Sequence, residues 1–326
     1  MRLPIACLAL CALLVAACGG SSNDKATTAP VTDFASPAPP VAGSGPPLNS
    51  LLGLPGDSAQ IDTPDVLVAS GNDYAAGKEM RLPVGLLHKD GSQFLADGGK
   101  IEIYIAPDGN AGSAGPFEAT YVPIEGPGIT LAPEDIKGVY VAKITVPDAG
   151  GYLMAAKYTI DGKESSASGS INIAAAEGSP PVGAEAPPSE TPTIKSTGGD
   201  FAQLTTANPP DKTLLEYSIA DSIKAKQPFV AVFATPKFCA SRLCGPTVQL
   251  VEAVQRNMKD TPMRFIHVEI YNGNDPSAGP NPWVQQWALP SEPWVFVVGA
   301  DGKIRSKFEG AVGLAELEQA ARAALS

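Results

Sequence analysis

The sequence predicts two folded domains, an immunoglobulin-like β-sandwich followed by an α/β domain. About seven short runs of alternating apolar residues, separated by turns, lie within residues 59–175, and no helical period interrupts them. Strands of this number and spacing are typical of an immunoglobulin-like β-sandwich. Within residues 201–326, by contrast, the apolar patterns predict strands and helices in the order β-α-β-α-β-β-α.

Two stretches rich in Pro, Gly, Ala and Ser separate these regions. Residues 18–58 contain few large apolar side chains, so we expect a disordered tether there. Residues 176–200 are predicted to be a second, Pro-rich linker between the two domains. The formal net charge of -11 and the lack of basic clusters argue against a nucleic-acid partner.

Residues 1–17 have the pattern of a secretory signal peptide, with Arg2 followed by an apolar run that ends in small residues. The run is too short for a comfortable membrane span. The last of these residues together with Cys18 read Val-Ala-Ala-Cys, which resembles the bacterial lipobox. We therefore expect a lipid on Cys18 and an extracytoplasmic protein anchored to a bacterial membrane, in the periplasm or at the cell surface. An ordinary signal peptide with a chance cysteine is the alternative.

The candidate active site is a cysteine pair between a predicted strand and a predicted helix. An apolar run at 229–234 is followed by Cys239, Cys244 and then Pro246, which is favoured at the start of a helix. Residues five apart on one helix are about 8.6 Å apart, and a disulfide needs roughly 7 Å or less, so at least one cysteine must lie in a loop. A bridge this short stabilises a fold by only about 2 kcal/mol. We therefore favour a redox-active pair over a structural disulfide.

The two cysteines are predicted to differ in their surroundings. A helix N-terminus carries unpaired N–H groups that favour a thiolate, and we expect these groups to act on Cys244. Cys239 lies between Lys237 and Arg242 and should be more exposed to a partner. Which of the two attacks stays open on these grounds.

The C-terminal domain resembles the thioredoxin superfamily, and within it the tethered bacterial disulfide reductases of the cytochrome-maturation type. The segment VGAEAPPSETPT is similar to their lead-in, and SEPWVFVVGADGKI is similar to their cis-proline strand and hairpin. The resemblance implies a thioredoxin-like fold, a cis peptide bond before Pro293 that faces the cysteines, and Cys239 as the attacking thiol. The chain departs from the family because four residues separate its cysteines where the family has two, and because LCGPT carries Thr247 in place of the second cysteine of WCGPC.

Two further residues are candidates for the site. Glu292 precedes the expected cis-proline, where a carboxylate could transfer a proton during exchange or disfavour a thiolate by like-charge repulsion. A solvated turn residue is the alternative. His267 lies in a predicted strand and would join Cys239 and Cys244 as a ligand only if the protein handled copper.

The sequence leaves three classes of function open. The first is a membrane-anchored thiol–disulfide oxidoreductase with a protein thiol or disulfide as its partner and no cofactor. The second is a non-catalytic binding lipoprotein with a structural disulfide. The third is a copper-handling protein similar to the assembly factors of cytochrome oxidase. A peroxidase is weaker still, because the pattern Pro-x-x-x-Thr-x-x-Cys is not matched at either cysteine.

Overall fold

The computed structural model describes most of the chain beyond the predicted signal peptide, with four short gaps. The signal peptide, Cys18 and most of the predicted tether lie outside the described residues. The last part of the tether contains a short helix, α1 (Leu48–Leu52), whose Leu48 is buried against Tyr104 and Ala155. Among the described residues, no helix has both the length and the apolar character needed to cross a membrane. The described ranges are 42–56, 61–90, 99–131, 135–160 and 162–326.

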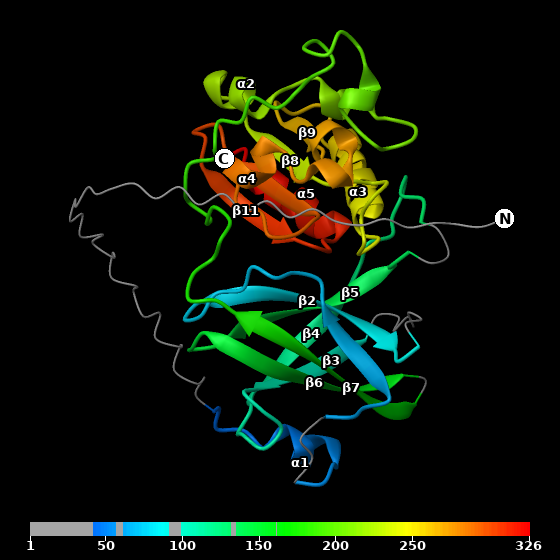
Figure 1. Ribbon diagram of the computed structural model, residues 1–326, viewed down its shortest axis with the longest axis vertical. Coiled ribbons are helices and arrows are strands. Elements are labelled where there is room, and N and C mark those ends of the chain that lie inside the picture. Colours follow the sequence, from blue (N-terminus) through cyan, green and yellow to red (C-terminus); the bar gives the residue numbers. More distant parts are fainter. Residues whose placement is uncertain (1–41, 57–60, 91–98, 132–134, 161) are drawn as a thin grey trace, which may run out of the picture. The chain divides into compact units, whose positions relative to one another are not determined.

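Seven strands form a closed barrel in the order β1-β2-β5-β4-β3-β6-β7 (Figure 1). β1 pairs antiparallel with β2 on one side and parallel with β7 on the other, through Asp65 and Val66. This second pairing closes the barrel. The strands are β1 (Asp65–Ala69), β2 (Glu79–His88), β3 (Lys100–Ala106), β4 (Ala114–Pro123), β5 (Gly138–Thr145), β6 (Gly150–Ile160) and β7 (Lys163–Ile173).

The predicted immunoglobulin-like β-sandwich is therefore wrong. A sandwich has two separate sheets, each with unpaired edge strands, whereas each of these seven strands pairs with a neighbour on both sides. The alternating pattern is the same in both architectures, because alternate side chains face the core in either case. Leu82, Val84 and Leu86 of β2 do point into the barrel core. The pattern thus locates strands without saying which of them pair.

The C-terminal region contains a second sheet of four strands in the order β11-β10-β8-β9 (Figure 1). β8 and β9 run parallel, and β10 is antiparallel to both β8 and β11. The strands are β8 (Phe229–Phe233), β9 (Arg264–Val268), β10 (Trp294–Val298) and β11 (Ile304–Glu309). The helices are α2 (Ile219–Lys224), α3 (Cys244–Asn257), α4 (Pro282–Gln286) and α5 (Leu314–Ala323).

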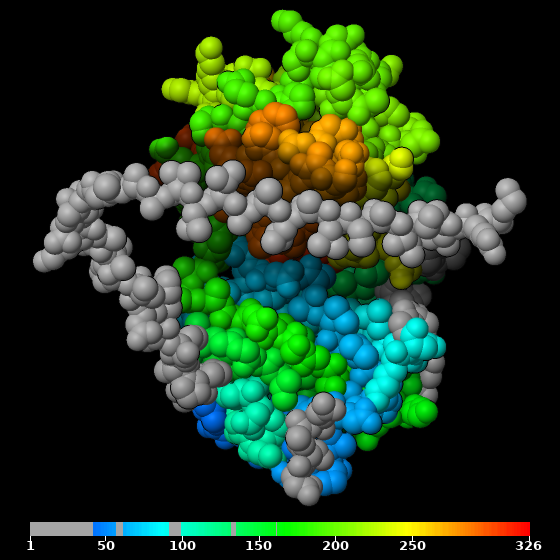
Figure 2. All heavy atoms as spheres, in the orientation of Figure 1, coloured from blue at the N-terminus to red at the C-terminus, as the bar shows by residue number. Residues whose placement is uncertain are grey.

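Helices contribute to both faces of this sheet. Residues of α3 and α5 join one apolar cluster with Val230 and Val232 of β8. Residues of α2 and α4 join another cluster with Phe229 and Phe233 on the opposite face of the same strand. Figure 2 shows that α4 and the loop before it, coloured orange, lie at the surface.

The α/β class with a thioredoxin-like fold, predicted for this region, is also corrected. Two of the helices in this region, α2 and α4, are only six and five residues long. Of the three strand pairs in the second sheet as described, β8–β9 alone is parallel. An α/β class implies a mainly parallel sheet joined by helical crossovers. The predicted strands and the hairpin of β10 and β11 are present, but β10 also pairs antiparallel with β8, which the sequence pattern did not reveal.

The segment predicted as a linker packs against the second sheet. The Gly183 N–H donates a hydrogen bond to the Ile304 carbonyl (2.8 Å), and the Ile304 N–H donates to Ala184 (2.9 Å). Farther along, the Ser189 hydroxyl accepts a bond from the Trp287 indole (2.9 Å). These bonds attach the segment to β11 and to the end of α4.

Charged side chains join the barrel to the second sheet within one compact unit. The Lys307 ammonium forms ion pairs with Glu177 (3.1 Å) and Asp73 (3.4 Å), and all three side chains are largely buried. Arg81 of β2 forms a bidentate pair with Glu316 of α5 (2.7 and 2.8 Å). A bidentate guanidinium–carboxylate pair restricts orientation as well as distance.

Candidate functional site

The cysteine pair lies in the loop that connects β8 to α3. Cys239 and Cys244 form a disulfide, and their Cα atoms are 5.9 Å apart. Cys239 lies in the loop, and Cys244 is the first residue of α3. The sequence predicted this loop-and-helix arrangement from the five-residue spacing together with Pro246 as the start of the helix. Arg242 between them has a φ of 58°, which is the left-handed region and reverses the chain just before the helix.

The two sulfur atoms have different surroundings. Cys244 is fully buried, whereas Cys239 is half-buried. The Cys244 N–H at the start of α3 is directed at the Cys239 Sγ (3.3 Å), and the Ser241 hydroxyl lies 3.2 Å from the same sulfur. A thiolate on Cys239 would therefore have two nearby donors and the positive end of a helix.

This arrangement reverses one expectation from the sequence. The helix N–H was expected to favour a thiolate on Cys244 itself. In the structure the amide of Cys244 instead faces its partner sulfur, so exposure and electrostatics both favour Cys239. The direction of a backbone N–H depends on how the loop folds back over the helix, which spacing does not reveal.

Leu243 attaches the cysteine loop to the barrel. Its side chain is 1% exposed and packs in an apolar cluster with Ile124, Val139 and Ala311. Ile124 follows β4, and Val139 belongs to β5. The residue next to Cys244 is therefore held by barrel side chains, so the barrel helps to position the loop.

Glu292 and Pro293 directly precede β10, at the end of the sheet from which the cysteine loop starts. The Glu292–Pro293 peptide bond is cis, as the resemblance implied. Trp294, the next residue, pairs with Phe233 at the end of β8. The antiparallel register therefore places the start of β10 beside the end of β8, where the loop to Cys239 begins.

Glu292 has a half-buried carboxyl group, and its electrostatic neighbour is Tyr271. Burial raises the pKa of Glu292. Burial and the nearby carboxylate of Glu292 raise the pKa of Tyr271. The Tyr271 ring in turn meets the Phe238 ring edge-on, with centroids 6.4 Å apart. Phe238 directly precedes Cys239, so this aromatic pair lies next to the cysteine loop, and the effect of Glu292 on the pKa of Tyr271 indicates that its carboxyl is near the pair.

His267 is held by groups other than the cysteines. Its Nε2 lies 3.0 Å from the Ala234 carbonyl, and its Nδ1 lies 3.2 Å from the Thr205 hydroxyl. The carbonyl can only accept, so Nε2 carries the proton and Nδ1 accepts from Thr205. Burial lowers the pKa of His267, which favours this neutral form. Among the described residues no group of three or more His, Cys, Asp or Glu side chains could hold a metal ion.

A buried carboxylate that the sequence analysis did not assign supports the turn before Cys239. Glu269 accepts hydrogen bonds from the N–H and the hydroxyl of Thr206, both at 2.5 Å. The Thr206 hydroxyl in turn accepts one from the Lys237 N–H (3.2 Å). Nothing in the sequence connects residue 206 with residue 237.

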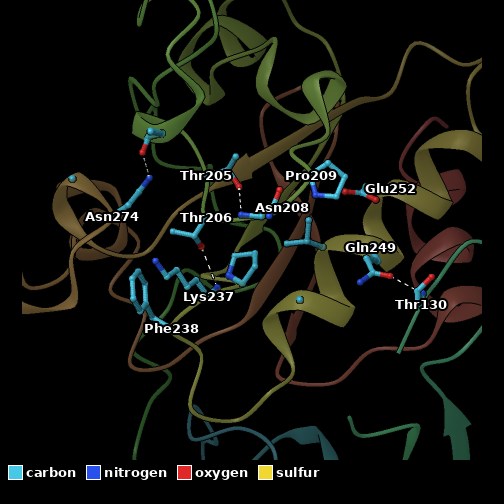
Figure 3. A pocket seen from close by; sticks show the side chains of 16 residues that line it. Thr130, Thr205, Thr206, Asn208, Pro209, Lys237, Phe238, Gln249, Glu252 and Asn274 are labelled. Atoms are coloured by element: carbon cyan, nitrogen blue, oxygen red, sulfur yellow. Dashed lines mark hydrogen bonds between the residues drawn. The ribbon is translucent and has the colours of Figure 1, made fainter. Parts of the chain in front are cut away.

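A groove of about 1080 Å³ lies next to the loop that carries the cysteines. Figure 3 shows Lys237 and Phe238 at one end and Gln249 and Glu252 at the other. Gly245, directly after Cys244, also lines it, so sequence neighbours of both cysteines contribute to the groove, whereas the cysteines themselves do not line it. The remaining walls come from residues 205–209 and 273–274, with Ala202, Thr130, Pro236 and Val248.

Comparisons with known proteins provide little further guidance. No protein-family model matches the chain, and no curated protein matches its sequence. One similar structure is a thiol:disulfide interchange protein of the thioredoxin family from Chlorobium tepidum TLS, at 14% identity and a TM-score of 0.27 over 31% of this chain and 82% of that one. Another is titin M4, at 13% identity and a TM-score of 0.16 over 35% of this chain and 99% of that one. At such TM-scores neither likeness supports an assignment of fold or activity.

Proposed function

We propose that the protein exchanges thiols and disulfides with a partner protein through Cys239 and Cys244. The observation that carries this proposal is the asymmetry of the pair: Cys239 is half-buried and faces the first N–H of α3, while Cys244 is fully buried. One reachable sulfur with thiolate-favouring donors and one protected sulfur suit an attacking and a resolving cysteine.

The exchange proceeds in two balanced steps. In the reduced protein, the Cys239 thiolate attacks a partner disulfide, forms a mixed disulfide and releases one partner thiolate. Cys244 then loses its proton and attacks Cys239 Sγ, which forms the intramolecular disulfide and releases the second partner thiol. Two electrons pass to the partner, and the reverse sequence oxidises a partner dithiol.

We assign the proton transfer at Cys244 to Glu292. A buried thiol must lose its proton before it can attack, and a half-buried carboxyl with a raised pKa is a suitable acceptor. Glu292 lies beside Pro293, at the end of the sheet where the cysteine loop begins, and this position supports the assignment.

Redox titration tests the function directly. The folded protein is equilibrated with dithiothreitol or glutathione buffers, its free thiols are alkylated, and the products are measured by mass spectrometry. We expect a reversible two-electron transition with one disulfide per chain. A disulfide that stays oxidised in dithiothreitol until the protein unfolds would make the bridge structural and leave the chain as a binding protein.

No observation in the described part of the structure specifically supports copper handling. Both ring nitrogens of His267 are engaged by Ala234 and Thr205, so either nitrogen would have to give up its hydrogen bond before it could bind copper with the cysteines.

We further propose that the protein works at the outer face of a bacterial membrane, anchored by a lipid on Cys18. This proposal rests on the lipobox-like sequence that precedes Cys18. Mass spectrometry of the native N-terminus is expected to find an acylated Cys18 as the first residue. An unmodified N-terminus at another position would remove the anchor from the proposal and leave the cysteine chemistry unaffected.

A further inference from the structure

The groove beside the disulfide follows one face of α3. Gly245, Val248, Gln249 and Glu252 line it, and their spacing of three and four residues places them on the same side of the helix. A β-carbon on Gly245 would meet no atom within 4 Å, so the wall next to Cys244 is open. The groove therefore runs along α3 from Gly245, the residue after Cys244, to Glu252, which Figure 3 labels.

Glu252 is the charged group at the far end of this path. Its side chain is half-buried, and no hydrogen bond or ion pair joins its carboxylate to another residue that the structure describes. Burial and the nearby Asp211 carboxylate raise the pKa of Glu252, and Arg256 opposes this. The Arg256 guanidinium also donates to the Gly128 carbonyl (3.2 Å). Glu252 is thus a partly desolvated carboxylate without a dedicated counter-ion.

The cation at the near end has a different environment. Lys237 is exposed, and its ammonium lies 5.2 Å from the centre of the Phe238 ring. A well-hydrated ammonium that already contacts an aromatic face gains less from a new partner than a desolvated carboxylate does. The groove should therefore select for positive charge at Glu252 more than for negative charge at Lys237.

We propose that the groove binds an extended segment of the partner protein that carries a lysine or arginine about four residues from its exchanging cysteine. Glu252 lies eight positions after Cys244 in α3, which corresponds to about 12 Å along the helix. An extended chain covers this distance in roughly four residues at about 3.3 Å each. The formal net charge of -11 adds long-range attraction for a basic partner. This inference depends on the proposed exchange at Cys239.

Single-turnover kinetics with short peptides test the charge preference. Each peptide carries one cysteine as a mixed disulfide with a chromogenic aromatic thiol, and the reduced protein, freed of excess reductant, supplies both electrons. The attack of Cys239 on the peptide sulfur releases the chromogenic thiol, and Cys244 then releases the peptide thiol. The peptides place Arg, Gln or Glu four positions from the cysteine, on either side of it, or Arg directly beside it. Rates with dithiothreitol correct for the intrinsic reactivity of each peptide.

We expect the peptide with Arg at the fourth position to react about fivefold faster than its Glu counterpart, as for a partly buried ion pair. Arg directly beside the cysteine should give a smaller advantage, and added salt should reduce the preference.

Variants of Glu252 connect the preference to this carboxylate. Glu252→Gln should remove the difference between the Arg and Glu peptides, and Glu252→Lys should reverse it. Glu185→Gln is the matched control, because Glu185 is exposed and pairs through its backbone with Lys303, next to the β10–β11 turn. It should keep the wild-type preference.

The outcomes separate this inference from the proposed function. Equal rates for all peptides, or a preference that survives in Glu252→Gln, would overturn the basic-segment proposal while exchange itself stands. Failure of the reduced protein to react with any peptide would instead overturn the exchange activity on which the inference depends.

Discussion

Replacement of Cys239 with serine should abolish thiol–disulfide exchange, whereas Cys244→Ser should leave a protein that still attacks. Cys239 is the sulfur that is half-buried rather than fully buried and that faces the Cys244 N–H and the Ser241 hydroxyl. In Cys244→Ser no second thiol remains to resolve the mixed disulfide, so the partner should stay covalently bound. In Cys239→Ser the remaining thiol is buried, and a partner should not reach it.

The two variants serve as controls for each other. Both lose the same disulfide, so any loss of stability from the missing cross-link should be similar in both. Non-reducing electrophoresis and mass spectrometry with a disulfide-bonded model peptide would show the trapped species. Trapping by Cys239→Ser in place of Cys244→Ser would exchange the two roles, and trapping by neither would argue against exchange.

Glu292→Gln should slow the exchange by on the order of tenfold to a hundredfold, because positioned proton transfer contributes at least that much in many enzymes. The loss should fall on the resolving step, in which Cys244 gives up its proton. In single-turnover experiments the mixed disulfide with the model peptide should therefore accumulate in the variant. The first attack by Cys239 should keep its wild-type rate.

The pH dependence supplies a second readout. Burial raises the pKa of Glu292. In the wild type the rate of the resolving step should therefore rise with pH as this carboxyl ionises, and in Glu292→Gln this rise should be absent. A carboxyl with a raised pKa in the folded state favours folding at pH below its unfolded pKa, and this contribution is lost as pH rises through the folded pKa. Removal of the charge should therefore stabilise the protein at neutral pH while it lowers activity.

Glu185→Gln is again the matched control and should change neither the pH profile nor the resolving rate. If Glu292→Gln has wild-type kinetics at every pH, Glu292 is a solvated turn residue and takes no part in the proton transfer. A variant that is both slower and less stable would indicate a structural role.

Much of the candidate site could be predicted because it depends on local sequence. The apolar run at β8 and the position of Pro246 predicted a strand, a loop and the start of a helix, since these choices are made over a few residues. The five-residue spacing predicted that at least one cysteine would lie outside the helix, and the position of Pro246 indicated that this cysteine is Cys239. The direction of the Cys244 N–H and the burial of Leu243 could not be predicted, because both depend on segments distant in sequence.

Local sequence patterns predicted where the strands run, which residues alternate toward a core, and that two cysteines lie between a strand and a helix. Folding is what pairs β1 with β7 to close a barrel and lets Thr206 connect Glu269 to the turn before Cys239. The difference follows from the range of the interactions. Side-chain alternation and helix starts depend on neighbours in the chain, whereas strand pairing and loop support join residues that are brought together only by folding.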